Sequence, residues 1–521
     1  MQTLDLIIIF GYLIGITLFG IIYAGKQETT EDYFVGDRNV PWWAIAASIV
    51  ATETSTITFI SVPGVAFARN GNFEFLQVVF GYLCGRVVIS LLFIPLYFKG
   101  ELQTVYQLLG DRFGTKVKML ASALFVVMRN IADGIRLLLT AFVLAAVYVA
   151  FQPDASYETV VIGSIILLGL VMIVFTFFGG MEAVIWIEVV QLAIYIGGAI
   201  AAGVVLMNNI DGGFSNAVAL GEQFQKFKVF DFNLDFTKTY TFWSGLLGGC
   251  FLTMSTHGTD QYLVQRYLCT DKASRASLAL LSSGAVILGQ FIGFLFIGVL
   301  LFAFYHPFTD PLFSQISEAC AKILPEQAAK CFADPNFAKS AANVYPFTGG
   351  DKVFPDFITK FMPSGLSGLV VAAIFAAALS SSLNSIAATA INDLYKPFAK
   401  DKSDKHLLKL SGILTVVIGL VQIVIAVAFM KTASSALNLA LSVASLINGP
   451  ILGVFLVGTF LKKAKENHAL IGMAASICLM IYILLGTKIA WTWYALIGSL
   501  TTFFVAFLAS LFIKNSETSE K

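Results

Sequence analysis

Apolar stretches separated by polar loops run through almost the whole chain. A membrane-spanning helix needs about 20 apolar residues, and on this criterion the pattern predicts thirteen spans. They cover residues 4–24, 41–67, 74–98, 117–150, 158–178, 181–207, 241–264, 276–305, 364–391, 407–430, 434–460, 468–486 and 490–513. The pattern therefore predicts an all-α polytopic membrane protein with two long loops, 208–240 and 306–363.

The composition agrees with this interpretation, since 57% of the residues are hydrophobic and only 12% are charged. Soluble domains carry about 25% charged residues. The first apolar stretch has neither a basic leader nor a small-residue cleavage site, so we interpret it as a retained span. The net charge of +1 gives no reason to expect nucleic acid. No obligate protein partner is evident, and the expected surrounding is the lipid bilayer.

Lysine and arginine are concentrated in alternate loops, which gives the predicted orientation. One set of loops carries Lys26, Arg38, Lys99, Arg112, Lys116, Lys118, Arg266, Lys272, Arg275, Lys396, Lys400, Lys402, Lys405, Lys409, Lys462, Lys463 and Lys465. The short loops of the other set carry Arg69, Lys431 and Lys488. The positive-inside rule then places the N-terminus outside and the C-terminus in the cytoplasm of a cell membrane. Both long loops fall outside, and Cys320 and Cys331 in the second either form a disulfide or stay free.

The second predicted span contains the polar run Thr52-Glu53-Thr54-Ser55-Thr56, followed by Thr58. Polar groups at membrane depth are costly in lipid, so this run should face a cavity or a partner. An ionised Glu53 in such a place needs a cationic partner or a raised pKa.

Three charged residues of a later span, Arg129, Asp133 and Arg136, share one helix face because they occur at i, i+4 and i+7. Such a stripe should face protein or water. Together with Glu53 and Arg86 it carries one excess positive charge, which favours a carboxylate-bearing substrate. Two alternatives stay open: a structural ion-pair network without substrate contact, and an interfacial Arg129 whose side chain snorkels.

Helix-break signals occur at Pro63-Gly64 and between Ser255 and Thr259. His257, beside the second signal, is either a gate or proton relay or a satisfied buried histidine. Asp260 is expected to pair with Arg266 or to cap the following helix segment.

Several separated segments resemble the sodium/solute symporter family. They are Asp32 to Gly36 with the polar run after it, Phe175 to Gln191 with its Gly179-Gly180 pair, Asp260 to Arg266, Ala372 to Tyr395, and Gly449 to Gly453. The resemblance implies a leucine-transporter-type fold with two inverted five-helix repeats, in which ion and solute bind at broken helices near the membrane midplane. The repeats are expected at 41–207 and 241–460, separated by the exterior loop 208–240. An extra span with a cytoplasmic loop (1–40) precedes them, and extra spans with a cytoplasmic tail (461–521) follow.

The resemblance also implies a sodium site built from oxygen ligands, which suit a hard cation. The expected ligands are the carbonyl oxygens of Ala51, Thr54 and Ala377 and the hydroxyl groups of Ser380 and Ser381. Compared with the family, three residues are missing between these serines and Leu383-Asn384. We anchor the register from the left, where the identical run is longer; the right anchor removes the hydroxyl ligands. The alternative role of the serines is back-bonding or helix packing.

Further site residues follow from the same resemblance. Glu53, Ser55 and Thr58 match substrate-contacting positions, and Arg136 matches an arginine that some members carry. Arg86 is a candidate partner for Glu53 on a separate ground, because it lies in the next span. Glu188 stands where some members place a sodium-binding aspartate; its open roles are structural, second cation ligand or proton carrier.

These observations predict a secondary active transporter that couples sodium to the uptake of a small organic solute. One alternative is a proton-coupled or sodium-independent transporter that uses Glu53, Glu188 or His257. Another is a sensor module, although no cytoplasmic domain is apparent. An enzyme is disfavoured, because no nucleophile elbow, phosphate loop or metal-ligand cluster occurs.

Overall fold

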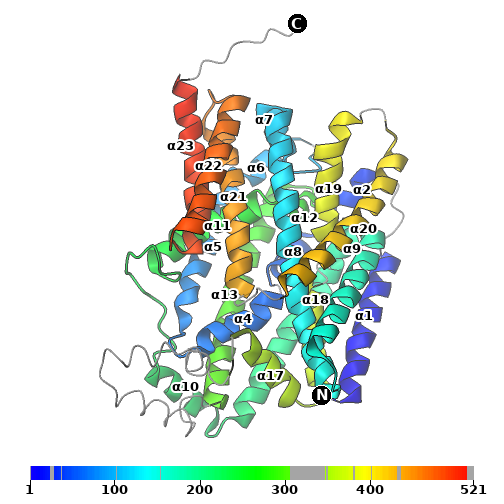
Figure 1. Ribbon diagram of the computed structural model, residues 1–521, viewed down its shortest axis with the longest axis vertical. Coiled ribbons are helices and arrows are strands. Elements are labelled where there is room, and N and C mark those ends of the chain that lie inside the picture. Colours follow the sequence, from blue (N-terminus) through cyan, green and yellow to red (C-terminus); the bar gives the residue numbers. More distant parts are fainter. Residues whose placement is uncertain are drawn as a thin grey trace.

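The computed structural model describes residues 2–23, 29–36, 38–54, 56–100, 102–152, 154–305, 347, 350–378, 382–399, 402–430 and 436–512. Within these ranges it is helical and contains no strand (Figure 1). Eight of the described helices are long and apolar enough to cross a membrane, and one bent helix pair raises the count to nine. The predicted all-α membrane fold is confirmed, whereas the count of thirteen spans stays a prediction.

The helices of the first half of the chain begin with an apolar helix and include the longest ones. They are α1 (Thr3–Tyr23), α2 (Thr30–Val35), α3 (Trp42–Glu53), α4 (Thr56–Phe67), η1 (Phe73–Phe75), α5 (Leu76–Leu92), α6 (Ile94–Tyr97), α7 (Gln107–Phe113), α8 (Thr115–Phe151), α9 (Tyr157–Asn209) and α10 (Gly213–Gln223).

The second half contains more short pieces between its long helices. They are η2 (Ser244–Gly248), α11 (Gly249–Gly258), α12 (Gln261–Leu268), α13 (Ala273–Tyr305), η3 (Gly350–Lys352), α17 (Val353–Lys360), α18 (Leu366–Ala378), α19 (Ser382–Thr389), η4 (Ala390–Tyr395), η5 (Lys396–Phe398), α20 (Asp404–Phe429), α21 (Ala436–Phe460), α22 (Glu466–Gly486), η6 (Trp491–Trp493) and α23 (Tyr494–Phe512).

The helix α9 consists of two spans joined at Gly180. This residue has φ 59° and ψ 178°, a conformation that glycine adopts without steric cost. The two apolar segments on either side are Tyr157–Val174 and Gly180–Asn209. The sequence pattern predicted this pair of spans, and the break at Gly180 confirms it.

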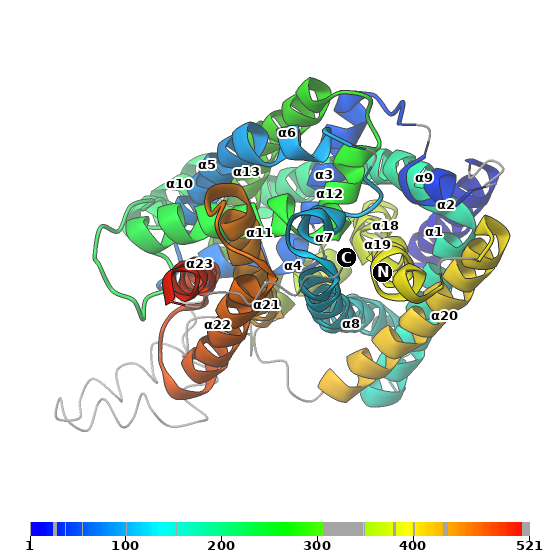
Figure 2. The same ribbon diagram turned by 90° about the horizontal axis from the view of Figure 1, so that it is seen from above.

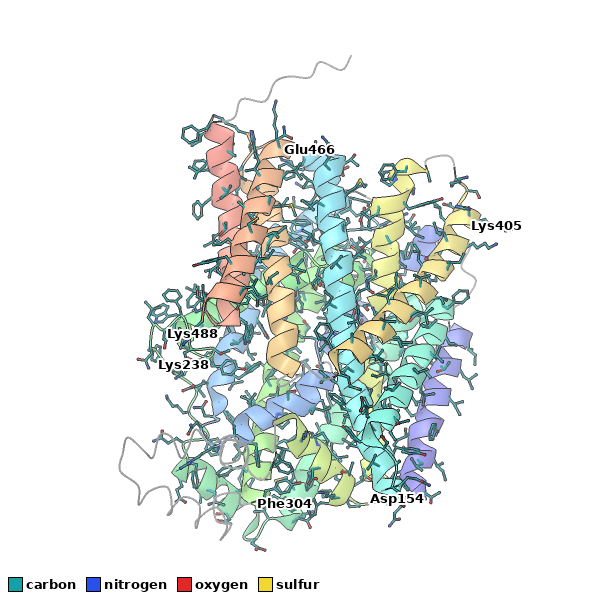
Figure 3. The ribbon with its side chains drawn as sticks, viewed as in Figure 1. Asp154, Lys238, Phe304, Lys405, Glu466 and Lys488 are labelled. Atoms are coloured by element: carbon teal, nitrogen blue, oxygen red, sulfur yellow. The ribbon has the colours of Figure 1, made fainter. Side chains whose placement is uncertain are left out.

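The flanking helices lie on opposite sides of the bundle, α1 on one side and α22 with α23 on the other (Figures 1 and 2). Figure 3 places Lys405 and Glu466 at one end of the bundle and Asp154 and Phe304 at the other. The loops next to Lys405 and Glu466, which the charge bias assigned to one side, therefore share an end. Which end faces the cytoplasm stays a prediction.

A buried lysine from the segment after α10 closes the end of α4. The Nζ atom of Lys226 donates to the carbonyl oxygens of Ala66 at 3.1 Å, Phe67 at 3.4 Å and Arg69 at 3.3 Å, and also to that of Ala68. A cation at a helix C-terminus complements the helix dipole. Burial nevertheless lowers the pKa of Lys226 to about 7.

Candidate functional site at the two broken helices

The first break separates α3 from α4 within the second predicted span. The helix α3 ends at Glu53, Thr54 has non-helical angles (φ −79°, ψ 73°), and the two helix axes differ by 59°. The predicted break at Pro63-Gly64 is wrong, because Pro63 lies inside α4. Gly64 instead permits close packing, since a Cβ atom there would lie 2.5 Å from the Gly350 carbonyl oxygen.

Neutral groups on neighbouring helices, one donor and two acceptors, satisfy the polar groups at this break. The Tyr195 hydroxyl donates to the Thr54 carbonyl oxygen at 2.8 Å. The Thr54 hydroxyl contacts the Gln290 side-chain oxygen at 2.9 Å, and the Thr56 hydroxyl donates to the Ile374 carbonyl oxygen at 3.0 Å. The break therefore lies against α9, α13 and α18 and exposes backbone oxygens to polar, uncharged partners.

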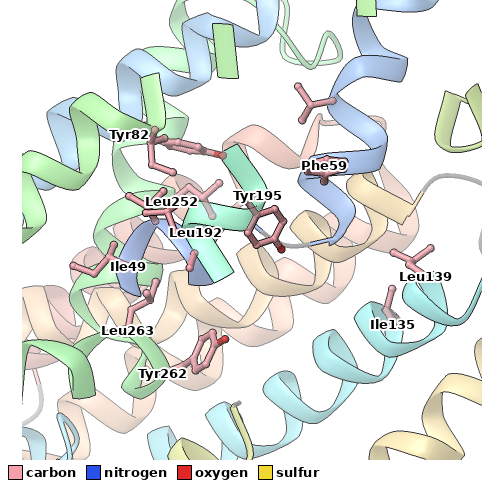
Figure 4. Packing of buried hydrophobic residues seen from close by; sticks show 14 of the residues in the cluster. Ile49, Phe59, Tyr82, Ile135, Leu139, Leu192, Tyr195, Leu252, Tyr262 and Leu263 are labelled. Atoms are coloured by element: carbon pink, nitrogen blue, oxygen red, sulfur yellow. The ribbon is translucent and has the colours of Figure 1, made fainter. Parts of the chain in front are cut away.

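Apolar side chains close the space around the break. Figure 4 shows Ile49, Leu192, Tyr195, Leu252 and Leu263 in one cluster, contributed by α3, α9, α11 and α12. All five side chains are buried. The low-dielectric surroundings strengthen the polar interactions that the cluster encloses.

Only part of the predicted sodium site lies within the described residues. Ala51 and Thr54 belong to the last turn and the end of α3, and Ala377 belongs to the last turn of α18. Carbonyl groups in the last turn of a helix lack intrahelical partners. Ser380 and Ser381, and the predicted substrate residue Ser55, lie outside the described residues. Cys320 and Cys331 lie outside them as well.

Glu53 forms an ion pair with Arg86, which confirms the partner that the sequence predicted for this carboxylate. His257 joins them, with Nε2 3.3 Å from Glu53 Oε2 and 3.5 Å from Arg86 Nη2. Arg86 is 1% exposed and the Glu53 side chain 13% exposed. The Thr58 hydroxyl donates to the Glu53 carbonyl oxygen at 3.3 Å. This cluster connects the first break to α5 and α11.

The second break separates α11 from α12, at the end of the predicted Ser255–Thr259 signal, and confirms it. α11 ends at Gly258, and the Asp260 side chain accepts a hydrogen bond from the Tyr262 backbone N–H at 2.9 Å. The capping role predicted for Asp260 is therefore confirmed. The predicted pair with Arg266 is wrong, because Asp260 Oδ2 lies 3.7 Å from Arg129 Nη1 instead.

Arg129 is buried and does not snorkel. It donates to both oxygens of Asp133, at 2.9 Å and 3.0 Å, and its guanidinium carbon lies 3.9 Å from the centre of the Tyr262 ring. Arg136 lies on the same face, with Nη1 3.7 Å from Asp133 Oδ1 and 3.4 Å from the Tyr262 hydroxyl. Asp260 adds a negative charge, so the cluster is neutral and the predicted positive excess is wrong.

Glu188 on α9 pairs with Arg266 on α12. The Arg266 Nη2 atom contacts Glu188 Oε1, and Nε lies 3.2 Å from Oε2. Ser48 also donates to Glu188, and Thr52 donates at 3.0 Å. Both members of the pair are at most 1% exposed. α3, α9 and α12 are thus joined by one buried charge network.

Sequence reasoning missed the role of Arg266, which had been assigned to a basic loop. The structure buries it completely, because the second broken span continues to Leu268, beyond its predicted end at residue 264. One signal was present: Arg266 stands between Tyr262 and Tyr267-Leu268, which is an apolar setting. The roles of Tyr195 and Gln290 carried no sequence signal, because each is one polar group in an apolar helix.

A comparison with family models places the chain in a known family. The model of the Sodium:solute symporter family matches residues 33–476, and the chain belongs to this family. The chain is accordingly a sodium-coupled symporter and not an enzyme.

Relatives and a solved structure agree with this assignment. The chain is 31% identical to the sodium/sialic acid symporter NanT of Aliivibrio fischeri over 100% of this chain and 95% of that protein. It is 26% identical to the human sodium-coupled monocarboxylate transporter 1, over 93% of this chain and 74% of the other. A solved outward-open, substrate-bound sodium-coupled sialic acid symporter has a TM-score of 0.80 at 27% identity, with 99% of both chains covered.

Proposed function

We propose that this symporter carries a carboxylate-bearing solute of the sialic-acid type into the cell together with sodium. NanT and a second relative, SiaT of Proteus mirabilis at 28% identity, are sodium/sialic acid symporters, and a further relative transports monocarboxylates. The solutes named for these proteins share a carboxylate. The proposed orientation places the N-terminus outside and the C-terminus in the cytoplasm, as the positive-inside rule predicts.

The observation that carries the solute proposal is the loose pairing of Arg136. Within the described residues, its one carboxylate neighbour within 4 Å is Asp133, at 3.7 Å, whereas Arg129 donates to Asp133 at 2.9 Å and 3.0 Å. A guanidinium presents a planar fork of donors that matches a carboxylate. Arg136 can therefore bind a solute carboxylate without breaking a short ion pair. Glu53, Arg86 and Thr58 are proposed to line the same site.

For sodium we propose the ligands expected from the family: Ala51, Thr54, Ala377, Ser380 and Ser381. The support is the break at Thr54, which frees backbone oxygens, and the contact between Thr56 and Ile374, which joins the break to α18. The charged groups around this site are three carboxylates and three guanidinium groups, so together they carry no net charge. They are Glu53, Asp133, Asp260, Arg86, Arg129 and Arg136. One sodium ion and one solute carboxylate together keep the site neutral, which favours their joint binding, and such coupling is reciprocal.

Glu188 is proposed to be structural. Its two oxygens accept hydrogen bonds from Arg266, Ser48 and Thr52. A second cation at this place requires Arg266 to move away. His257, 3.3 Å from Glu53, favours proton coupling as a second candidate, because histidine is a common proton carrier in proteins. Arg129, Asp133 and Asp260 are proposed to form the network around the site.

A thermal-shift experiment on the purified protein tests this function. A ligand that binds the folded state raises the apparent unfolding temperature by mass action. Sialic acid in sodium buffer is expected to give a larger shift than in potassium buffer. The methyl ester of sialic acid, which lacks the charge, is the matched control and should give a smaller shift. Equal shifts for acid and ester contradict carboxylate recognition, and equal shifts in sodium and potassium contradict coupling.

A further inference from the structure

Asp5, on the flanking helix α1, is a fully buried carboxylate that lies against the start of α18. Its Oδ1 atom accepts hydrogen bonds from the Gly365 backbone N–H at 2.7 Å, the Gly368 backbone N–H at 2.9 Å and the Ser367 hydroxyl at 2.7 Å. The Ser364 hydroxyl lies 3.4 Å from Oδ2. Burial of a charge requires this kind of compensation.

These bonds replace a cap that α18 does not supply itself. The first turn of a helix leaves its backbone N–H groups without intrahelical partners, and a side chain at the preceding residue often accepts from them. That residue here is Gly365, which has no side chain and a φ of 89°. Asp5 provides both the acceptor and the negative charge that a helix N-terminus favours.

The packing of α1 on α18 is built for this contact. A Cβ atom at Gly368 would lie 2.7 Å from the Asp5 Cα atom and 2.8 Å from its carbonyl oxygen. Any larger residue at Gly368 would push α1 away and lengthen the bonds of Asp5. The close approach therefore depends on glycine at this position.

A second flanking helix caps a corresponding helix at the other end of the bundle. Glu466, the first residue of α22, accepts a hydrogen bond from the Lys116 backbone N–H in the first turn of α8, at 2.9 Å. Gly114, before α8, also has a positive φ of 113°. α8 and α18 are the third helices of the two predicted repeats. Each is capped by a carboxylate from a helix outside its repeat.

Of α8 and α18, only α18 carries a proposed sodium ligand, Ala377, and this residue lies at its far end. α18 contains 13 residues, Leu366–Ala378, and is therefore about 20 Å long. Near that end the Ile374 carbonyl oxygen accepts from Thr56 at 3.0 Å, so the position of α18 sets the distance between Ala377 and the first break.

We propose that Asp5 is a positioning residue for sodium: it fixes the start of α18 so that the Ala377 carbonyl faces the break at Thr54. This inference rests on the sodium site proposed above. Because sodium binding and the capped arrangement of α18 stabilise each other, loss of the cap lowers the fraction of protein ready to bind sodium and raises the apparent dissociation constant.

The test measures sodium-driven solute uptake in proteoliposomes for the full chain. Asp5→Ala is expected to raise the sodium concentration for half-maximal uptake about fivefold, as for loss of a helix cap. Asp5→Asn keeps the shape and one acceptor and should give a smaller rise, and Ser367→Ala should do the same. The half-saturating solute concentration at saturating sodium should stay within about twofold. Glu466→Gln is the matched control, since α8 carries no proposed sodium ligand, and its sodium dependence should equal that of the wild type.

Three outcomes decide the matter. If the wild type needs sodium but Asp5→Asn and Ser367→Ala leave the half-maximal sodium concentration unchanged, the positioning role is wrong. If Asp5→Ala fails to fold, these two milder variants still test the proposal. If the Glu466→Gln and Asp5→Asn variants shift sodium dependence equally, the effect is general destabilisation, which contradicts the proposal. A wild type without sodium dependence contradicts the proposed function itself.

Discussion

The two broken helices satisfy their exposed polar groups in different ways. At the first break, between α3 and α4, the partners of Thr54 and Thr56 are neutral: Tyr195 donates to the Thr54 carbonyl oxygen, and the Thr56 hydroxyl donates to the Ile374 carbonyl oxygen. The charged cluster of Glu53, Arg86 and His257 lies beside them. At the second break, between α11 and α12, the chain supplies its own cap, Asp260. That cap also belongs to a charge network with Arg129.

Because their partners differ, we expect the two breaks to have different tasks within one pseudo-symmetric fold. Neutral hydroxyl donors hold the carbonyl oxygens of the first break weakly, so a sodium ion can replace or supplement them. The second break is held by buried charges, which cost several kcal/mol to separate and so stay paired. We accordingly propose that the first break binds the ion and that the second is a fixed frame beside which Arg136 binds the solute.

The largest expected effect comes from breaking the buried pair of Glu188 and Arg266, which joins α12 to α3 and α9. Glu188→Gln leaves the buried Arg266 without its charged partner, so the free energy of unfolding should fall by about 3–5 kcal/mol. Thermal unfolding of the purified protein measures this loss. Arg266→Met should be similarly destabilised, and the double variant should be more stable than either single one. A sodium Hill coefficient clearly above one that falls to one in Glu188→Gln would instead indicate a second cation site.

Replacing Arg136 tests whether the region of the second break binds the solute. Arg136 lies on α8 and contacts Tyr262 of α12. Arg136→Gln removes a charged hydrogen bond worth about 1.5–3 kcal/mol, so the half-saturating concentration of sialic acid should rise about 10- to 150-fold. Uptake measured over a range of solute concentrations gives this value. Arg136→Lys keeps the charge but not the planar fork. Its half-saturating concentration of sialic acid should therefore lie between those of the wild type and Arg136→Gln. Binding of the methyl ester should change little; an equal loss for acid and ester contradicts direct recognition.

A smaller effect is expected at the first break. Thr56→Val removes the hydrogen bond to Ile374, at a cost of about 1 kcal/mol, and should raise the half-maximal sodium concentration about fivefold. The matched control is Thr140→Val, which loses its bond to Thr56 but leaves Thr56 bonded to Ile374. If both variants change sodium dependence alike, the Thr56–Ile374 contact does not position the ion site.

The smallest effect concerns the pH dependence of stability at the end of α4. The pKa of Lys226 is lowered by burial to about 7 from 10.5, so above pH 7 the folded protein releases this proton while the unfolded chain keeps it. The unfolded state then binds more protons, and stability should rise with pH between about 7 and 10.5. Lys226→Met should reduce this slope, and Lys99→Met, at an exposed lysine, should not. A slope unchanged in Lys226→Met assigns the pH dependence to other groups.

The membrane fold was predictable because long apolar stretches have one structural solution in lipid. The second break was predictable from Ser255–Thr259. The first was not, since Pro63 gave the stronger local signal, yet a proline can lie inside a helix whose neighbours satisfy the freed backbone groups.

The pairing of charges was only partly predictable. Glu53 with Arg86 and Arg129 with Asp133 followed from the cost of burying a charge alone and from helix spacing. The pair of Glu188 and Arg266 joins residues 78 positions apart, and no local pattern indicates which distant charges meet. The contact of Asp5 with α18 spans most of the chain and was invisible for the same reason.

The central claim is that sodium entering at the first break drives uptake of a carboxylate-bearing solute. The most direct measurement is uptake of labelled sialic acid into proteoliposomes under an inward sodium gradient, compared with an inward proton gradient at equal sodium on both sides. The account predicts accumulation above the external concentration with the sodium gradient and none with the proton gradient alone. Accumulation driven by protons in the absence of a sodium gradient would contradict it.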